Sequence, residues 1–302
     1  MSVIVFGYYG FNNAGDELLL DETIKLLQEL SLPMPYVVAN GPLAAPNPTF
    51  NRWSLVAWIK QLRSADALIF GGGSIFQSVT SAWSLLYYLT IVCLAKLFQC
   101  RVILLCHGWG PFRRVWHERL AAFVLQSTHR SWRLKLNHPL FLDDPVFCDL
   151  TLTQPVKNRS HGDGTVGICV RPTIDFEQLS DVVRSQYASI ETLSCQSDGH
   201  DGHALLDVWE SHDLGFSLVI TDRYHVAIWA SRHGIPWVAI SSDPKLVDLA
   251  NEVHQCCYSS LEALILDDQW KTVKNNQLFD WANLCCGLRP NIRSWLNACI
   301  DH

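Results

Sequence analysis

An arginine and a histidine, one residue apart, stand where a predicted strand turns into a predicted helix. The segment reads Thr221-Asp222-Arg223-Tyr224-His225 and follows the predicted strand Ser217–Thr221. A helix N-terminus attracts anions and disfavours cations. Arg223 and His225 therefore predict either a carboxylate partner, such as Asp222, or an anionic ligand. The helix dipole would also favour a neutral His225, which suits a base.

A second arginine, Arg171, follows the predicted strand Val166–Val170. The end of a buried strand is an unusual place for this side chain, because a guanidinium that is buried without a partner is strongly destabilising. Either a protein carboxylate or an anionic ligand is therefore expected to meet Arg171.

Glycine-rich segments follow three predicted strands in the first half of the chain. Glycine allows backbone shapes that a Cβ atom would forbid, and a helix that begins near Asp16 would point free N–H groups into the first of these loops. We predict loops that hold an anion or a sugar. The alternatives are a turn capped by Asp16 and tight strand-to-helix turns. The candidate residues are Asn13, Gly15, Asp16, Gly72, Gly73, Ser74 and His107.

Short apolar strands alternate with helical stretches along the whole chain, which predicts parallel sheets covered on both faces. The predicted strands are Val3–Gly7, Tyr36–Ala39, Ala67–Phe70, Val102–Cys106, Val166–Val170, Ile190–Ser194, Ser217–Thr221 and Trp237–Ile240. The predicted helices are Gly15–Leu30, Trp53–Ser64, Ala82–Phe98, His117–Lys135, Phe176–Tyr187, a helix around Leu205–Ser211, one from Arg223, Lys245–Val253 and Ile292–Ile300.

The polar stretch Pro155–Thr165 is rich in turn residues and reads as a linker. We therefore predict an α/β protein with two doubly wound, Rossmann-like domains, residues 1–157 and 165–290. A C-terminal helix within residues 291–302 is expected to pack back on the first domain. Ligands of open α/β sheets bind beyond the carboxyl ends of the strands, so a cleft between the two domains is the expected site.

Composition excludes several classes of protein. The chain has 302 residues, of which 49% are hydrophobic and 17% charged, so disorder is not expected. A net charge of −6 without a large basic cluster argues against a nucleic-acid partner. The densest basic stretch, Arg113–Lys135, is interpreted as the solvated side of a helix or, alternatively, as a contact with an anionic membrane surface.

Cysteine usage and hydropathy indicate a reducing compartment. The chain has 11 cysteines, and their spacing predicts no metal site. The first residues read as a strand rather than a signal peptide, so we expect a cytoplasmic protein. The apolar stretch Ala82–Ala95 is shorter than the roughly 20 residues that a spanning helix needs, and a buried helix is the better interpretation.

The motifs together resemble the polysaccharide pyruvyl transferase family, in particular its CsaB-type members. Each motif alone is weak, but their order along most of the chain is specific. The segments are GYYGFNNAGDE (7–17), GGGSIFQ (71–77), HGWGP (107–111), DDPVF (143–147), VRP (170–172) and TDRYHVAIWASRHGIPWVAISSDPK (221–245).

This resemblance implies a fold similar to that of the GT-B glycosyltransferases and an enzyme that uses phosphoenolpyruvate as its co-substrate, with no other cofactor. The acceptor would be a sugar of a polysaccharide precursor, free or lipid-linked at the inner face of the membrane, and the product a cyclic pyruvate ketal. The resemblance implies that His225 is catalytic and that Arg171, Arg223 and Lys245 bind the donor.

The chain departs from the family's pattern in several places. His107 replaces a usual Gln, Tyr224 replaces a usual aliphatic residue, and the stretch between Lys135 and Asp144 is short and lacks an expected Arg-Asp motif. The segment Cys195–Leu205 is compressed as well. These departures indicate an altered substrate or weaker activity. They keep two alternatives open, a GT-B-like glycosyltransferase that uses a nucleotide sugar and a non-catalytic sugar-binding relative.

Overall fold

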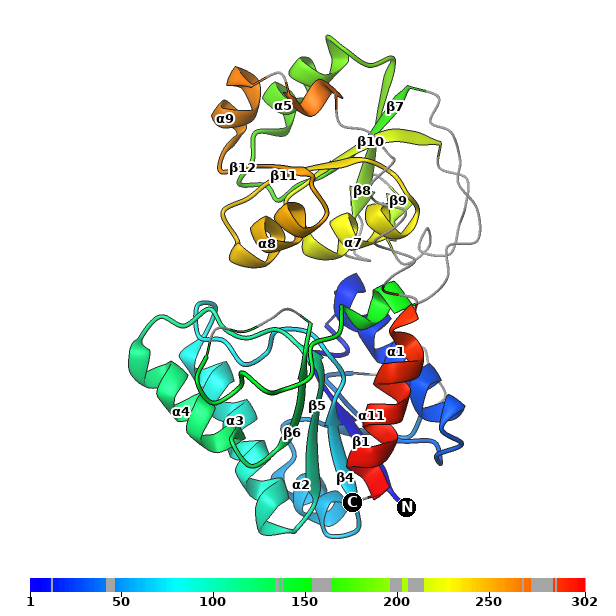
Figure 1. Cartoon of the computed structure of the whole chain (residues 1–302), viewed down its shortest axis with the longest axis vertical. Coiled ribbons are helices and arrows are strands. Elements are labelled where there is room, and N and C mark those ends of the chain that lie inside the picture. The colour runs from blue at the N-terminus through cyan, green and yellow to red at the C-terminus, as the bar shows by residue number, and fades with distance from the viewer. Residues whose placement is uncertain are drawn as a thin grey trace. The chain divides into compact units, whose positions relative to one another are not determined.

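The chain divides into two compact units, and each is described by itself. The first unit is Met1–Thr153 with Leu288–His302, and the second is Gln154–Gly287. The computed structural model (Figure 1) describes residues 1–11, 13–41, 47–133, 136, 138–153, 164–195, 203–205, 215–267, 269–272, 285 and 287–301.

The described strands of the first unit form a parallel sheet in the order β3-β2-β1-β4-β5-β6. Their bounds are β1 Val3–Phe6, β2 Tyr36–Ala39, β3 Thr49–Asn51, β4 Ala67–Phe70, β5 Arg101–His107 and β6 His129–Trp132. Phe6 pairs with Val38 on one side and with Phe70 on the other. The winding of the sheet therefore changes direction between β1 and β4, and the loops after these strands leave the sheet side by side.

Successive side chains of β1 point to opposite faces of this sheet. Ile4 and Phe6 pack with α2, α3 and α4, whereas Val3 and Val5 pack with α1 and α11. Such alternation is expected of a strand buried on both faces. The helix bounds are α1 Ala14–Glu29, α2 Leu55–Leu62, α3 Ala82–Leu97, α4 Val115–Leu125 and α11 Arg289–Asp301, with a 3-10 turn η1 at Leu150–Thr153.

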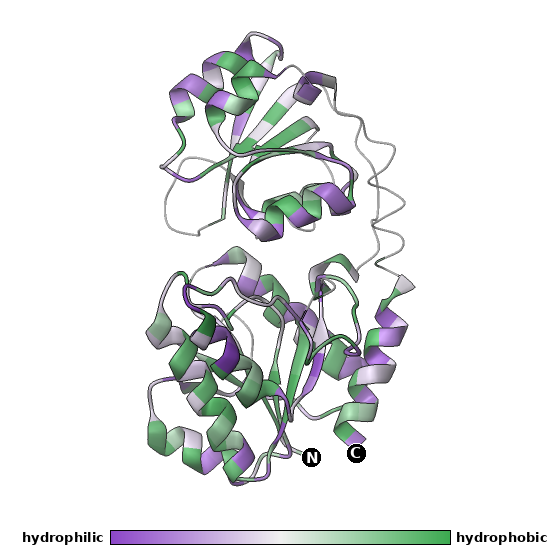
Figure 2. Ribbon diagram, turned by 60° about the vertical axis from the view of Figure 1, so that its left-hand side comes forward, coloured by the Kyte–Doolittle hydropathy of each residue, from purple (hydrophilic) through white to green (hydrophobic). Residues whose placement is uncertain are grey.

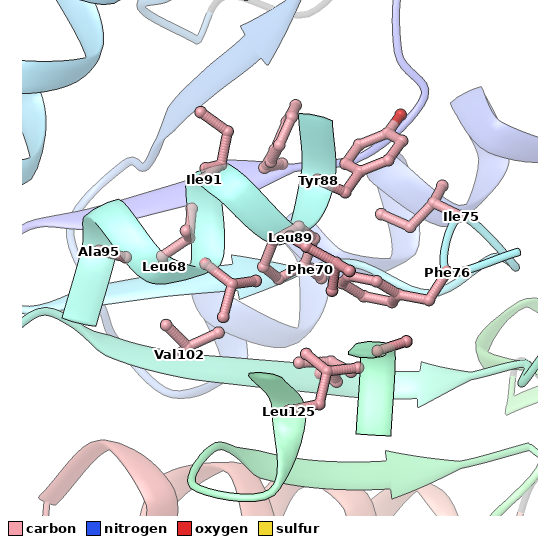
Figure 3. Close-up of a cluster of buried hydrophobic side chains, with 14 of the residues drawn as sticks. Leu68, Phe70, Ile75, Phe76, Tyr88, Leu89, Ile91, Ala95, Val102 and Leu125 are labelled. Atoms are coloured by element: carbon pink, nitrogen blue, oxygen red, sulfur yellow. The ribbon is translucent and has the colours of Figure 1, made fainter. Parts of the chain in front are cut away.

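The core beneath α3 and α4 is built from large apolar side chains (Figure 3). Phe70 of β4 and Phe76 have no exposed surface, nor have Leu68 and Leu125, and Val102 is only 4% exposed. Each buried side chain of this size contributes about 1.5–3 kcal/mol to folding. Figure 2 shows the matching pattern, with hydrophobic residues along the central strands of the first unit.

The last helix, α11, belongs to the first unit although the second unit separates it in sequence. Its apolar side, with Ile292 and Leu296 fully buried, packs on the α1 side of the sheet. Arg289 adds ion pairs of 3.0 Å to Glu22 and 2.7 Å to Glu29. Apolar contact and charge therefore both hold α11 on this unit.

The second unit repeats the architecture. Its described strands are parallel in the order β12-β11-β10-β7-β8-β9, so the winding changes direction between β7 and β10. The strands are β7 Thr165–Cys169, β8 Ser189–Ser194, β9 His203–Ala204, β10 Phe216–Thr221, β11 Trp237–Ile240 and β12 Cys256–Tyr258. The helices within its described residues are α5 Phe176–Arg184, α7 Tyr224–Arg232, α8 Pro244–Glu252, α9 Leu261–Leu266 and the 3-10 turn η2 Gln269–Thr272.

The predicted fold class, two Rossmann-like units with parallel sheets, is confirmed. The predicted helix His117–Lys135 is too long, because α4 ends at Leu125 and β6 follows. Pairing of β6 along the open edge of β5 outweighs helical periodicity there, and Arg130 forms a 2.7 Å ion pair with Asp144. The short strands β3 and β12 were also missed.

The apolar stretch Ala82–Ala95 lies in α3, a helix of the α/β layer as predicted, but only the side that faces the sheet is buried and the outer side is exposed. None of the helices in the described ranges is both long and apolar enough to span a membrane. The predicted linker Pro155–Thr165 and the helix around Leu205–Ser211 lie mostly outside the described residues, as does most of the compressed segment Cys195–Leu205.

Candidate active site

The residues expected to bind the donor and the histidine expected to be catalytic follow three adjacent strands of the second sheet. Arg171 follows β7, Arg223 and His225 follow β10, and Lys245 follows β11. Because the strands are parallel neighbours, their carboxyl ends share one edge of the sheet. Arg171 and Arg223 flank the point between β7 and β10 at which the winding reverses. Ligands of open α/β sheets bind at such a point.

Asp222 connects the two arginines. Its carboxylate accepts a 3.1 Å hydrogen bond from the backbone N–H of Arg171. It also lies 3.4 Å from Nε of Arg171 and 3.7 Å from Nε of Arg223. Burial raises the pKa of the Asp222 carboxyl, although both guanidinium groups act to lower it. Two cations held by one carboxylate leave this cluster with a net positive charge when all three groups are ionised.

Both guanidinium groups are accessible to a ligand. The side chain of Arg171 is 49% exposed and that of Arg223 is 31% exposed. The expectation of a carboxylate partner for Arg171 is met by Asp222. The premise of a buried guanidinium is wrong, because Arg171 extends beyond the end of the strand into solvent, where the desolvation penalty is small.

The first turn of α7 adds to the positive potential. Arg223 is the N-cap residue, but its side chain makes no capping hydrogen bond, and the first turn holds no acidic residue. The backbone N–H of Arg223 donates to the hydroxyl of Thr221 over 2.9 Å, and that hydroxyl donates to the carbonyl of Cys169 over 2.7 Å. This chain of bonds fixes the start of α7 against β7. The helix dipole then favours an anion at this end.

His225 is the second residue of α7 and is half-buried. Its ring lies edge to face with that of Tyr224, with centroids 5.4 Å apart. Lys245 stands in the first turn of the neighbouring helix α8, where its backbone N–H donates to the N-cap Asp243 over 3.1 Å. Helices α7 and α8 are in contact, and the three residues predicted to bind the donor lie with the predicted catalytic residue His225 at one edge of the second sheet.

In the first unit, the loops after β1 and β4 enclose the ring of Tyr9. The hydroxyl of this buried side chain donates to the carbonyl of Gly71 over 3.3 Å. A Cβ atom on Gly7 would lie 2.4 Å from the ring, and one on Gly71 would lie 2.5 Å from its hydroxyl. Glycine is therefore required at both positions to seat Tyr9 between the two loops.

Helix α1 begins at Ala14, one residue before the predicted helix Gly15–Leu30, and its N-cap is Asn13, so the alternative of a turn capped by Asp16 is wrong. Asn13 accepts a 3.3 Å hydrogen bond from the backbone N–H of Gly15. Asp16 and Glu17 occupy the first turn, and Glu17 accepts a 2.7 Å bond from Gly10. The carboxylates of Asp16 and Glu17 already compensate the positive end of the α1 dipole. This loop therefore suits sugar hydroxyls better than an anion.

The loop after β4 meets both α1 and the loop after β5. Gly72 and Gly73 have φ angles of +85° and +84°. A Cβ atom on Gly73 would lie 3.5 Å from a carboxylate oxygen of Asp16. The backbone N–H of Gly108 donates to the carbonyl of Gly73 over 2.8 Å. The predicted residues Asp16, Gly72 and Gly73 are thus brought together, and the loop after β5 is bonded to them.

A buried ion pair lies beneath this loop. Arg133 donates to the hydroxyl of Ser74 over 2.8 Å and pairs with Asp149 over 3.1 Å. His107 beside it has no exposed surface and packs against the ring of Phe76, with centroids 5.6 Å apart. Burial, together with the charge of Arg133, lowers the pKa of His107 to about 3. His107 is therefore neutral and lies under the loop, whereas Ser74 is held in place by Arg133.

Arg52, at the end of β3, is a residue that sequence reasoning missed. It is 3% exposed and donates to the hydroxyl of Tyr88 over 2.8 Å and to the carbonyl of Gly7 over 3.4 Å. Aromatic rings surround its guanidinium at 5.0–5.8 Å from Phe6, Tyr8, Phe11, Trp53, Tyr87 and Tyr88. Arg52 thus anchors the β1 loop, and its place could not be predicted because β3 was not.

The model of the polysaccharide pyruvyl transferase family matches residues 13–133. This match supports that family. It spans α1 to β6 and therefore includes the glycine loops after β4 and β5, but not the arginine cluster of the second unit. No curated protein matches the chain. Among the described residues, no group of His, Cys, Asp and Glu side chains is placed to hold a metal ion.

Solved structures share the two-domain GT-B fold at low identity. A UDP-GlcNAc 2-epimerase from Methanocaldococcus jannaschii has a TM-score of 0.62 at 11% identity, covering 97% of this chain and 100% of that one. The epimerase from Neisseria meningitidis, bound to UDP-GlcNAc, gives 0.57 at 12% identity, with 99% and 100% covered. A glycosyltransferase from Streptomyces sp. SF2575, complexed with thymidine diphosphate, gives 0.51 at 12% identity, with 97% and 99% covered. These likenesses concern the fold alone.

Proposed function

We propose that the protein transfers pyruvyl from phosphoenolpyruvate to a sugar of a cell-surface polysaccharide precursor and forms a cyclic pyruvate ketal. The reaction would take place in the cytoplasm, on an acceptor that is free or linked to a lipid. The observation that carries this proposal is the pair of accessible arginines, joined by Asp222, at the N-terminus of the helix that bears His225. The family match in the first unit supports it.

The donor suits this cluster because it carries a carboxylate and a phosphate. Each guanidinium offers a fork of donors that fits either group bidentately. Arg171 and Arg223 stand on either side of Asp222, so they can bind two anionic groups of one small molecule. Lys245 and the N-terminus of α7 add positive potential at the same edge of the sheet.

The reaction needs one acid and one base, and His225 is the residue that we assign to both roles. A proton from the imidazolium adds to the methylene carbon of phosphoenolpyruvate, which leaves positive charge at C2. A sugar hydroxyl attacks C2 and returns its proton to the imidazole. The second hydroxyl then displaces phosphate from C2 and its proton leaves with the phosphate, so the atoms balance as ketal plus inorganic phosphate.

The acceptor sugar is assigned to the first unit. Asp16 and the hydroxyl of Ser74 lie at the glycine loops and can bond sugar hydroxyls. In the loop after β1, the rings of Tyr8 and Phe11 are stacked 4.1 Å apart, and Tyr8 is 40% exposed. An exposed aromatic face can pack against the apolar face of a sugar ring.

Ligand-dependent thermal unfolding tests the choice of donor. Phosphoenolpyruvate should raise the Tm of the wild-type protein, because a ligand that binds only the folded state stabilises it. Arg171→Lys keeps the positive charge but loses the pair of parallel hydrogen bonds that a guanidinium can donate. The affinity of this variant for phosphoenolpyruvate should therefore fall about 10- to 100-fold. Arg184→Lys, an exposed arginine paired with Asp181 in the same unit, is the matched control and should leave affinity unchanged.

Two other results would replace the proposal. A rise in Tm with a nucleotide sugar, and none with phosphoenolpyruvate, would indicate a glycosyltransferase. Stabilisation by saccharides alone would indicate a non-catalytic sugar-binding protein.

A further inference from the structure

Large apolar side chains are exposed at the N-terminal ends of three neighbouring helices of the first unit. At the start of α2, Trp53 is 65% exposed and Val56 is 78% exposed. Trp83 in the first turn of α3 is 81% exposed, and Val115 and Trp116 at the start of α4 are 63% and 49% exposed. Single exposed apolar residues are ordinary, but a group of this kind indicates an interaction surface.

These residues share one surface because α2, α3 and α4 cover the same face of the sheet (Figure 1). Each helix follows a parallel strand, so its first turn lies near the carboxyl edge, next to the glycine loops. The outer side of α4 continues the surface with Arg119 and Phe123, which follow Val115 at intervals of four residues. We refer to the outer surface of these helices as the α2–α4 face.

Basic residues greatly outnumber acidic residues in the segment of the chain that contains α2, α3 and α4. Residues 30–142 contain eleven Lys and Arg residues but only two acidic residues, a net charge of +9 within a chain of net charge −6. Three of the eleven do not add to the surface charge, because Arg130 and Arg133 pair with Asp144 and Asp149 and Arg52 is buried. The two acidic residues already have partners, since Asp66 accepts a 2.6 Å bond from the backbone N–H of Ser2 and Glu118 accepts a 3.3 Å bond from Trp109. Exposed basic residues on the face include Lys60, Arg63, Arg113, Arg114 and Arg119.

We propose that the α2–α4 face docks on an anionic lipid bilayer. Tryptophan side chains favour the headgroup region of a membrane, aliphatic side chains enter its apolar boundary, and arginines contact lipid phosphates. A saccharide is the less suitable occupant. It could stack on the exposed tryptophans, but it would leave the aliphatic side chains of Leu55, Val56 and Val115 without an apolar partner. Docking would place the glycine loops beside the bilayer, where an acceptor carried on a lipid is presented.

Flotation of the full-length protein with vesicles tests this proposal. Wild-type protein should float with vesicles of phosphatidylcholine and phosphatidylglycerol, and much less with phosphatidylcholine alone. R113Q/R114Q should lower the partition coefficient about 30-fold, since each basic residue near an anionic surface contributes roughly fivefold. W83S/F123S should lower it as well, because both side chains are exposed and would enter the lipid boundary.

The matched control is R184Q/L266S in the second unit, where the side chain of Arg184 is 62% exposed and Leu266 is 87% exposed. This pair should leave flotation unchanged. All three variants should keep the wild-type Tm and its response to phosphoenolpyruvate, so that failure of docking is separate from failure of the proposed reaction.

Three results would overturn the inference. The first is that wild-type protein does not float with anionic vesicles. The second is that R184Q/L266S loses as much binding as the two variants of the α2–α4 face. The third is that dextran sulfate binds as tightly as vesicles and W83S/F123S binds both normally, which would make the face a general polyanion site.

Discussion

Asp222 has a double role among the residues of the candidate active site. It holds Arg171 through both backbone and side chain, and it contacts Arg223, yet both guanidinium groups keep exposed surface. One carboxylate cannot neutralise two guanidinium groups, so the cluster keeps a net positive charge when all three groups are ionised. The partial exposure therefore suits arginines that are positioned by the protein and complete their contacts with a ligand.

His107 provides a residue-scale prediction about acid stability. Its pKa of about 3 in the folded protein lies below the unfolded value near 6.5, so below about pH 6.5 the unfolded state binds the extra proton. Above about pH 6.5 this histidine therefore does not lower the free energy of unfolding. As the pH falls from there toward 3, proton uptake by the unfolded state lowers the free energy of unfolding progressively. Between about pH 6 and about pH 4.5 this amounts to about 2 kcal/mol.

The substitution His107→Gln should remove that acid-dependent loss. Urea unfolding at the two pH values measures it, and the wild type should lose about 2 kcal/mol more than the variant. Equal losses in the two proteins would mean that His107 is not the buried neutral group that the structure shows.

At the scale of elements, the loop after β4 depends on the left-handed backbone at Gly72. A side chain there would be strained by the φ angle of +85°, and its Cβ atom would lie 2.9 Å from a methyl group of Leu19. Gly72→Ala should therefore lower the free energy of unfolding by about 1–2 kcal/mol. Gly41→Ala is the control, because nothing lies within 4 Å of its Cβ position.

Denaturant unfolding of these two variants compares them directly. The control should be neutral or slightly more stable, since alanine restricts the unfolded chain. If Gly41→Ala were destabilised as much as Gly72→Ala, the cost would not come from backbone geometry at the loop.

The elements that the sequence predicted well are those with buried strands and clear caps. Ala67–Phe70 and Trp237–Ile240 were predicted with the bounds that the structure shows, because a short apolar run between polar turns permits few alternatives. β3, β6 and β12 could not be predicted, since each lies toward the edge of its sheet and depends on pairing with a distant strand.

The candidate site shows the same division. The arginines and glycines at strand ends could be found from the sequence, because parallel strands bring their carboxyl ends to one edge. The bridging by Asp222 and the aromatic surroundings of Arg52 could not, because they depend on side-chain contacts between segments far apart in the chain. The burial of His107 was likewise not visible, since its position at a strand end suggested access to a ligand.

At the scale of the whole molecule, α11 closes the first unit after the chain has passed through the second. Leu296 is fully buried in the core on the α1 side of the sheet. Leu296→Ala should therefore destabilise the first unit by about 2–5 kcal/mol. Hydrogen exchange can locate the effect, with faster exchange expected in β1 and β5 and unchanged exchange in β10. Equal acceleration in both units would show that they do not have separate cores.

The central claim concerns the reaction itself, and product formation tests it most directly. Purified wild-type protein would be incubated with phosphoenolpyruvate and a panel of hexose and N-acetylhexosamine acceptors, with His225→Ala in parallel. We expect phosphate release together with the mass increment of a pyruvate ketal on the acceptor, and the loss of both in a variant that still binds phosphoenolpyruvate. A ketal formed equally well by His225→Ala would contradict the role of His225. The absence of any ketal from a wild-type protein that binds both substrates would contradict the proposed reaction.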